Sequence, residues 1–188
     1  MSKYNVYIED VSVEALFNKH GGIDGVKRFL QGKTKVVEAG DIMKKLLESL
    51  DTTVVPATKK KFVVKKQFVI DTSDKAKVKI SYLGSNFQEW FLDKIKKPIK
   101  KTKLRYDHLT ERSVDELIIV ELGGEEKAQT SLTEVFSLMK MQSNGEDGAL
   151  LNNGYANIFY VCDINGVLRA VYVTWYDGGW YVSARTVE

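Results

Sequence analysis

The stretch YANIFYVCDINGVLRAVYVTWYDGGWYVSARTV, residues 155–187, decides the fold. Its β-branched and aromatic runs are interrupted by two hairpin signals, Asn165-Gly166 and Asp177-Gly178-Gly179. The pattern predicts a three-stranded antiparallel meander. If Asn165-Gly166 is a two-residue loop, the facing residues are Ile164 with Val167, Phe159 with Tyr172, Tyr160 with Val171, and Ile158 with Val173.

Composition limits the protein class. A chain of 188 residues is long enough for about one domain with a proper core. The one cysteine, Cys162, excludes an internal disulfide and fits a reducing compartment. No signal peptide and no apolar run long enough to cross a bilayer are present. We therefore expect a soluble cytoplasmic protein with no membrane partner.

Helical periodicity predominates near the N-terminus. The spacing predicts a helix after Ser12, a second from Asp24 to Gly32, and a third from Asp41. The third carries an apolar stripe of Ile42, Met43, Leu46, Leu47 and Leu50, and residues 51–58 form a connector. We thus expect a helical region at residues 1–56 and an α+β domain at residues 57–188, whose antiparallel sheet packs against helices.

Between Phe62 and Tyr82, apolar residues alternate with polar ones, and this pattern predicts a hairpin with a loop at Thr72-Ser73-Asp74. It would pair Phe68 with Val78 and Ile70 with Ala76, leaving Lys65, Lys77 and Lys79 together on the opposite, solvated face.

Three Ser-x-x-Glu/Gln capping boxes, at Ser85, Ser113 and Ser131, predict helix starts. The Ser131 helix places Leu132, Val135, Phe136 and Met139 on one face and is the expected cover of the meander. Lys96–Lys103 reads as a basic loop and Leu104–Leu109 as a strand.

Motifs for chemistry are scarce. The sequence has neither a phosphate-binding glycine loop nor a dinucleotide fingerprint, and its two histidines lack the spacing of a metal pair. We expect no catalytic residue, no metal and no cofactor. Cys162 reads as a small buried side chain and His108 as a surface residue rather than a general base. A solvated face, rather than a cation site, is the preferred interpretation of Glu116, Glu121, Glu125 and Glu126.

The charge distribution is uneven. Between Lys59 and Arg105 the chain carries fifteen Lys or Arg residues against four Asp or Glu residues. Such a basic sector could neutralise the phosphates of DNA or RNA without reading their sequence, although a solvated lysine-rich face is the alternative. The candidate contacts are Lys59, Lys60, Lys61, Lys65, Lys77, Lys79, Lys96, Lys97, Lys100, Lys101, Lys103 and Arg105.

Two further patterns suggest nucleic-acid contact. Aromatic residues at the second turn, Trp175, Tyr176 and Trp180, could stack on bases if they remain exposed. Residues 13–30 loosely match a helix-turn-helix, although Gly25 within the second helix weighs against it.

Residues 21–32, residues 153–171 and the strand that begins at Trp180 resemble a set of small uncharacterised bacterial proteins, found mostly in uncultured lineages. The resemblance implies a free-standing bacterial protein and no particular activity. We therefore favour a non-sequence-specific nucleic-acid-binding accessory protein. The alternatives are a protein-interaction or structural module without catalytic activity, and an enzyme of a type that the motifs do not reveal.

Overall fold

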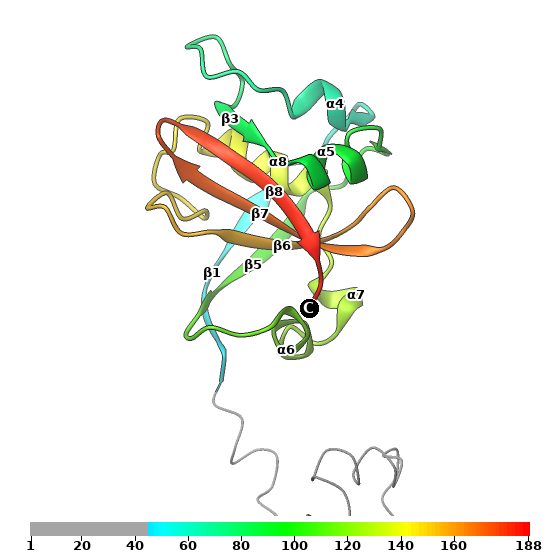
Figure 1. Ribbon diagram of the computed structural model, residues 1–188, viewed down its shortest axis with the longest axis vertical. Coiled ribbons are helices and arrows are strands. Elements are labelled where there is room, and N and C mark those ends of the chain that lie inside the picture. Colours follow the sequence, from blue (N-terminus) through cyan, green and yellow to red (C-terminus); the bar gives the residue numbers. More distant parts are fainter. Residues whose placement is uncertain (1–44) are drawn as a thin grey trace, which may run out of the picture. The chain divides into compact units, whose positions relative to one another are not determined.

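The computed structural model describes residues 45–188, the unit Lys45–Glu188 (Figure 1). The expected helices before Asp41, including residues 13–30, lie outside the described residues. The described elements are β1 (Leu47–Val55), β2 (Phe62–Val63), α4 (Val64–Gln67), β3 (Ile80–Leu83), α5 (Ser85–Phe91), β4 (Ile95–Lys96), β5 (Thr102–Leu109), α6 (Asp115–Glu121), α7 (Glu125–Ala128), α8 (Leu132–Met141), β6 (Asn157–Cys162), β7 (Leu168–Tyr176) and β8 (Gly179–Thr186).

A four-stranded sheet with the order β3-β8-β7-β6 forms the centre of the unit. Strands β6, β7 and β8 pair antiparallel in sequence order, which confirms the C-terminal meander. Strand β3 adds to β8 in the parallel direction, a feature that the sequence did not predict. Two antiparallel pairs, β1 with β5 and β2 with β4, complete the α+β architecture.

The register of the first hairpin differs by one residue from the prediction. Phe159 faces Val171 and Ile158 faces Tyr172, because the loop holds three residues instead of two. The N–H of Asp163 donates to the carbonyl of Val167 at 2.8 Å, and Gly166 closes the loop with a φ of +83°. A type I turn followed by a left-handed glycine has this form.

The second hairpin has the two-residue loop that the first one lacks. Asp177 and Gly178 connect Tyr176 to Gly179, and their φ angles are +49° and +77°. Positive φ at both central residues defines a type I′ turn, whose twist matches that of the flanking strands.

Helix α8 covers one face of the sheet, as its apolar spacing predicts. Leu132, Val135 and Met139 are fully buried against Val171 and Trp180. Ser131 caps the helix with a complete capping box: its Oγ accepts the N–H of Glu134 at 3.3 Å, and the Glu134 carboxylate accepts the N–H of Ser131 at 2.7 Å. The expected cover of the meander is confirmed.

The opposite face of the sheet is covered at the β6 end. Tyr160 and Ala170 face one another across β6 and β7. Their neighbours Val161 and Val171 point to the other face of the sheet, into the core that α8 covers. A second core surrounds this pair, formed by residues at the start of β1 and from α6 and α7: Leu46, Leu47, Ile118, Ile119 and Ala128.

Two expected elements are replaced by others. Residues 47–55, where the sequence predicts the end of a helix and a connector, form β1, which pairs with β5 from Leu47 to Val55 with one irregularity at Leu50. The expected hairpin between residues 62 and 82 is also wrong. Its first strand stops at Val63, α4 begins at Val64, and only one bridge, Asp71 with Ile80, links the two arms in the described structure.

Candidate nucleic-acid interface

Two lysine-rich segments lie side by side although about thirty residues separate them in sequence. Strand β2 pairs with β4, so that Phe62 faces Lys96. Just before β2, the N–H of Thr58 donates to the carbonyl of Ile99 at 2.9 Å, and the Thr58 hydroxyl accepts the N–H of Ile99 at 2.9 Å. These bonds place residues 59–66 next to residues 94–101.

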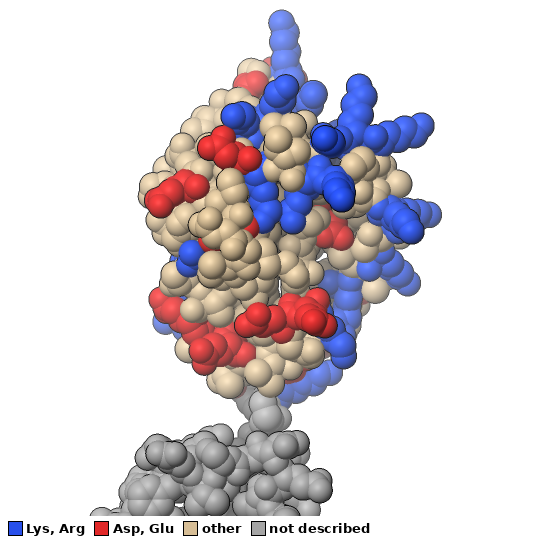
Figure 2. Space-filling model, turned by 90° about the vertical axis from the view of Figure 1, so that its right-hand side faces the viewer, with Lys and Arg blue, Asp and Glu red and all other residues tan. Residues whose placement is uncertain are grey.

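We call the lysines of residues 59–66 and 96–103 the lysine surface. All of its members are exposed except Lys96, which is half-buried. Figure 2 draws the side of the molecule that is on the right in Figure 1. Lys and Arg side chains gather over the upper part and the right-hand margin of that view, and the acidic side chains lie mostly elsewhere. The members are Lys59, Lys60, Lys61, Lys65, Lys66, Lys96, Lys97, Lys100, Lys101 and Lys103.

Most of these ammonium groups have no neutralising partner among residues 45–188. Lys65 pairs with Asp93 at 3.2 Å, but both side chains are largely exposed. Within residues 45–188, no carboxylate forms a salt bridge with any other member of the lysine surface. Exposed pairs contribute little to stability, so even Lys65 remains available to an anion.

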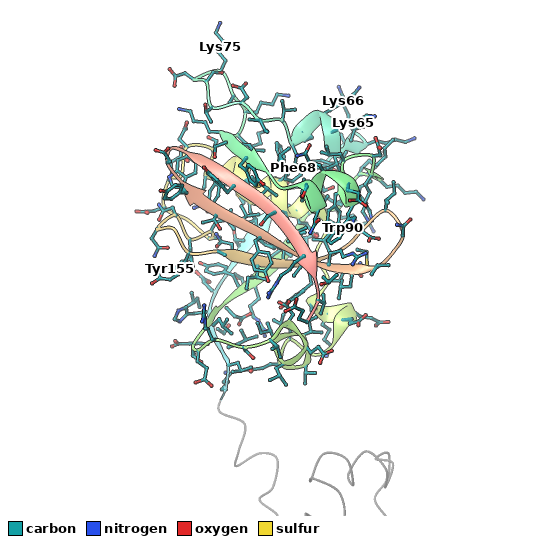
Figure 3. All side chains as sticks on the ribbon, viewed as in Figure 1. Lys65, Lys66, Phe68, Lys75, Trp90 and Tyr155 are labelled. Carbon is teal, nitrogen blue, oxygen red and sulfur yellow. The ribbon has the colours of Figure 1, made fainter. Side chains whose placement is uncertain are left out.

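Three of the candidate contacts, Lys77, Lys79 and Arg105, are not members of the lysine surface, although Lys77 shares a hollow with its member Lys66. The Lys79 ammonium forms a salt bridge with Asp74 at 3.1 Å, and the Arg105 guanidinium forms one with Asp107 at 3.0 Å. Lys77 lies on the loop before β3, where it lines a shallow hollow of about 270 Å³ together with Lys66 and Lys75. Because the predicted hairpin is absent, Lys65, Lys77 and Lys79 do not share a strand face. Figure 3 shows Lys65 and Lys66 on α4 and Lys75 on that separate loop.

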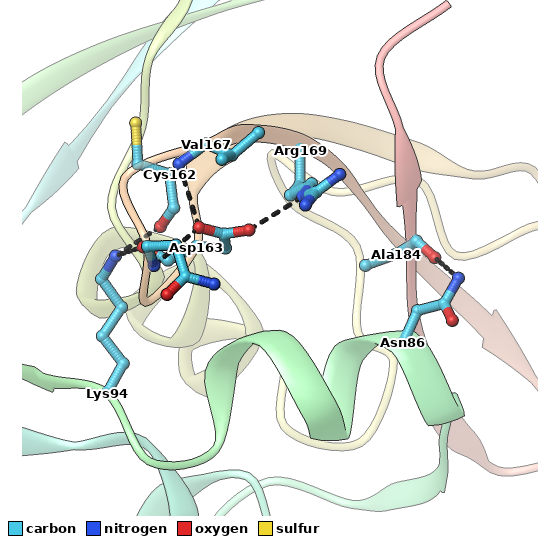
Figure 4. A network of polar contacts seen from close by, with 8 residues as sticks. Asn86, Lys94, Cys162, Asp163, Val167, Arg169 and Ala184 are labelled. Atoms are coloured by element: carbon cyan, nitrogen blue, oxygen red, sulfur yellow. Dashed lines mark hydrogen bonds and ion pairs between the residues drawn. The ribbon is translucent and has the colours of Figure 1, made fainter.

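One lysine of the basic sector has a structural role instead. The Lys94 ammonium donates to the carbonyl of Cys162 at 2.5 Å and to that of Asp163, which fastens the β6–β7 turn to the segment after α5 (Figure 4). Burial, and then the nearby charge of Lys96, lower the pKa of Lys94. The sequence gives no signal that separates Lys94 from its exposed neighbours.

A buried carboxylate organises the same turn. The Oδ1 of Asp163 accepts the N–H groups of Asn165 at 2.8 Å and Val167 at 2.9 Å, and its Oδ2 accepts Nε of Arg169 at 2.9 Å. Burial alone would raise the pKa of Asp163, but these hydrogen bonds and the charge of Arg169 hold it below its usual value. The Arg169 guanidinium lies 4.1 Å from the ring centre of Trp90 on α5.

A cleft of about 1000 Å³ opens between β5, the β6 edge and the segment from α6 to residue 130. Its walls are largely apolar, and Lys103, Arg105 and Lys127 supply cationic side chains. His108 is exposed and also lines the cleft. The carboxylate of the neighbouring Asp107 pairs with Arg105 at 3.0 Å.

The predicted stacking residues are divided by burial. Trp180 is fully buried and its indole N–H donates to the carbonyl of Gln142 at 3.0 Å, so its ring offers no face to a base. Trp175 is half-buried against it, whereas Tyr176 is 62% exposed. Tyr176 belongs to an exposed cluster with Tyr181 and Tyr82, on the face of the sheet opposite to Trp180. Side chains alternate between the two faces of a strand, so a buried Trp180 in β8 would have predicted that its neighbour Tyr181 is exposed.

Of the remaining polar candidates, Glu121 has a structural role. The Glu121 carboxylate accepts the N–H groups of Leu46 at 2.8 Å and Leu47 at 2.9 Å, while Glu116, Glu125 and Glu126 are exposed. No cluster of three potential metal-binding side chains occurs within residues 45–188. Cys162 is half-buried rather than fully buried, and its Sγ lies 2.7 Å from the side-chain amide of Gln129.

No protein-family model, curated protein or solved structure matched the chain. The resemblance to small bacterial proteins therefore stays a prediction. Among the helices of residues 45–188, none has the length and apolar character needed to cross a bilayer.

Proposed function

We propose that this protein binds nucleic acid without sequence specificity through the lysine surface. The observation that carries the proposal is the pairing of β2 with β4, which joins two separate lysine segments into one largely exposed area. Among the described residues, only Asp93 forms a salt bridge with a member of this area, Lys65. Lysine ammonium groups contact phosphates as point charges, so such an area holds a nucleic-acid backbone but does not read its bases.

Salt dependence is the first test. We expect fluorescence anisotropy with labelled DNA or RNA to show an affinity that falls by roughly 10³- to 10⁵-fold between about 50 mM and about 200 mM salt, if six to ten phosphates are contacted. Oligonucleotides of unrelated sequence should bind alike. Absence of binding at the lower salt concentration would eliminate the proposal.

Charge-matched variants localise the interaction. Replacing Lys97, Lys100 and Lys101 by Gln removes three members of the lysine surface. We expect the slope of log K against log salt to become shallower by about two for a single strand. The control replaces Lys45, Arg112 and Lys140 by Gln, which removes the same charge from exposed positions outside the lysine surface. Equal losses from both variants would assign binding to net charge instead of to this surface.

A second candidate, a protein-interaction module, is favoured by the exposed tyrosine cluster. Tyr82 and Tyr181 lie 5.5 Å apart between ring centres, and Tyr176 lies 5.7 Å from Tyr181. Tyrosine is enriched in protein–protein interfaces. A strictly monomeric chain in sedimentation experiments, with no co-purifying protein, contradicts this candidate.

A further inference from the structure

We propose that the cleft between β5 and β6 receives an unpaired base of the nucleic-acid strand whose phosphates lie on the lysine surface. The inference rests on the proposed function and adds that the preferred partner is single-stranded. Its physical basis is the continuity of charge from one site to the other, together with the shape and chemistry of the cleft.

Strand β5 connects the two sites. The lysine surface includes Lys100 and Lys101 immediately before β5, and it ends at Lys103 on the strand itself. Lys103 also lines the cleft, as does Arg105 two residues further along β5. A backbone that follows these lysines therefore reaches the cleft at Lys103, next to Arg105, whose guanidinium is paired with Asp107 at 3.0 Å.

The walls suit a flat, partly apolar ring. The apolar side chains of Leu104, Ile118 and Leu150 line the cleft. The aromatic residues Tyr106 and Tyr155 line it as well. Tyr155 is 71% exposed, and Figure 3 shows it at the edge of the unit beside the start of β6. The volume of about 1000 Å³ lies at the upper end of ligand sites, which usually measure about 300–1,000 Å³. A nucleoside fits within it.

Hydrogen-bonding groups are available on the edge of β6. The carbonyl of Tyr160 accepts the N–H of Thr130 at 2.8 Å, so it points away from β7. Ile158, two residues earlier, presents its N–H and carbonyl on the same side, and no backbone group within residues 45–188 bonds to them there. Since β6 is the edge strand, these groups can pair with the edge of a base.

Duplexes cannot use such a site. Their bases are stacked and present only edges in the grooves, so a base enters a cleft only after it is unpaired and unstacked. Single strands already expose their bases, and aromatic side chains stack on them regardless of sequence. The cleft therefore favours single strands over duplexes, whereas the lysine surface alone would accept both.

The test compares three ligands on the full chain by fluorescence anisotropy: a single-stranded oligonucleotide, its duplex, and an abasic single strand that keeps the phosphates and sugars. We expect the single strand to bind about 10-fold more tightly than the duplex and the abasic strand, the gain from stacking one base. Oligonucleotides containing 2-aminopurine should lose fluorescence on binding, because stacking quenches that base.

Matched tyrosine variants localise the base. Tyr155→Ala should lower single-strand affinity by about 10-fold and leave duplex affinity unchanged. Tyr176→Ala removes a tyrosine of similar exposure that does not line the cleft, and should change neither affinity. Both residues are exposed, so each variant should fold, which circular dichroism checks.

Failures of the two proposals are distinguishable. If all three ligands bind equally and with strong salt dependence, or if Tyr176→Ala weakens single-strand binding and Tyr155→Ala does not, the cleft is not the base site while the lysine surface stands. If no ligand binds at about 50 mM salt, both proposals are overturned.

Discussion

The Asp163 carboxylate and the Arg169 guanidinium meet at 2.9 Å inside the β6–β7 turn, where the Asp163 side chain is fully buried. The same carboxylate accepts two N–H groups of the loop. Those bonds define a loop of three residues, and the loop in turn sets which residues of β6 and β7 face one another.

Replacing Asp163 by Asn should therefore destabilise the protein. An amide keeps the shape but cannot accept all three hydrogen bonds, and it leaves Arg169 without its counter-ion. We expect a loss of about 2–4 kcal/mol in the free energy of unfolding, measured with urea. Asp177→Asn in the exposed second turn is the control and should change stability by less than about 0.5 kcal/mol. A similar loss for both variants would contradict this role for Asp163.

This turn also shows where sequence reasoning ends. Asn165-Gly166 correctly marks a hairpin, but that dipeptide serves two-residue and three-residue loops alike. The choice between them depends on Asp163, whose partner Arg169 is identified only after the strands have paired. The existence of the meander was thus predictable, while its register was not.

Acid should weaken the protein partly through Asp163. Because the pKa of Asp163 is lowered in the folded state, the folded carboxylate binds fewer protons than the unfolded one. Its contribution to stability is present above the unfolded pKa of about 3.9 and is lost as the pH falls through the lower, folded value. Urea titrations from about pH 5 downward should show the difference between wild type and Asp163→Asn shrinking; a constant difference would refute the linkage.

The Ser131 capping box should contribute measurably to α8. Ser131→Ala removes a cap that the structure shows complete, and we expect a loss of about 1 kcal/mol in urea unfolding. Ser85→Ala is the matched control, because Gly84 holds the N-cap position of α5 and no side chain caps that helix. Equal effects of the two substitutions would contradict the assignment.

The three capping boxes illustrate a limit of local patterns. All three precede a helix, yet only the Ser131 box forms. Gly84 occupies the cap of α5, and an added Cβ there would come within 3.2 Å of the Ser183 side chain. Close packing of α5 on β8, a tertiary fact, thus overrides the local preference for serine.

Strand and helix were also indistinguishable around Val64 and Phe68. Both residues are buried, and a spacing of four places them on one face of a strand and equally on one face of a helix.

The lysine surface illustrates the same limit. The sequence shows a basic sector, but only the β2–β4 pairing selects its neighbours, and Lys94 turns inward to bind carbonyl groups.

Gly145→Ala should be one of the most damaging single substitutions in the loop after α8. The residue has a φ of +73°, and an added Cβ would lie 2.1 Å from the ring of Trp175. We expect a loss of about 2–4 kcal/mol, from backbone strain and from displacement of the indole. Gly154→Ala has a similar φ of +88° with nothing within 4 Å, so it measures the strain alone. Near-ultraviolet circular dichroism should change for Gly145→Ala; equal losses in both variants would exclude the contact with Trp175.

The contact between Tyr160 and Asp115 predicts that the protein loses stability in alkali. Its hydroxyl donates to the buried Asp115 carboxylate at 3.0 Å. Burial and the charge of Asp115 raise the pKa of Tyr160 well above its usual value. The folded phenol therefore keeps its proton where the unfolded one releases it, so this stabilisation is full below about pH 10 and declines as the pH rises further.

Tyr160→Phe should reduce that decline. At neutral pH we expect a cost of about 1 kcal/mol, because Asp115 loses a donor but keeps Arg185 at 3.1 Å. Above about pH 10 the difference from wild type should narrow, measured by urea unfolding at each pH. The exposed Tyr155→Phe controls for the loss of a hydroxyl and should follow the wild-type curve. A difference between Tyr160→Phe and wild type that stays constant with pH would show that the phenol of Tyr160 ionises alike in both states, against the buried pairing with Asp115.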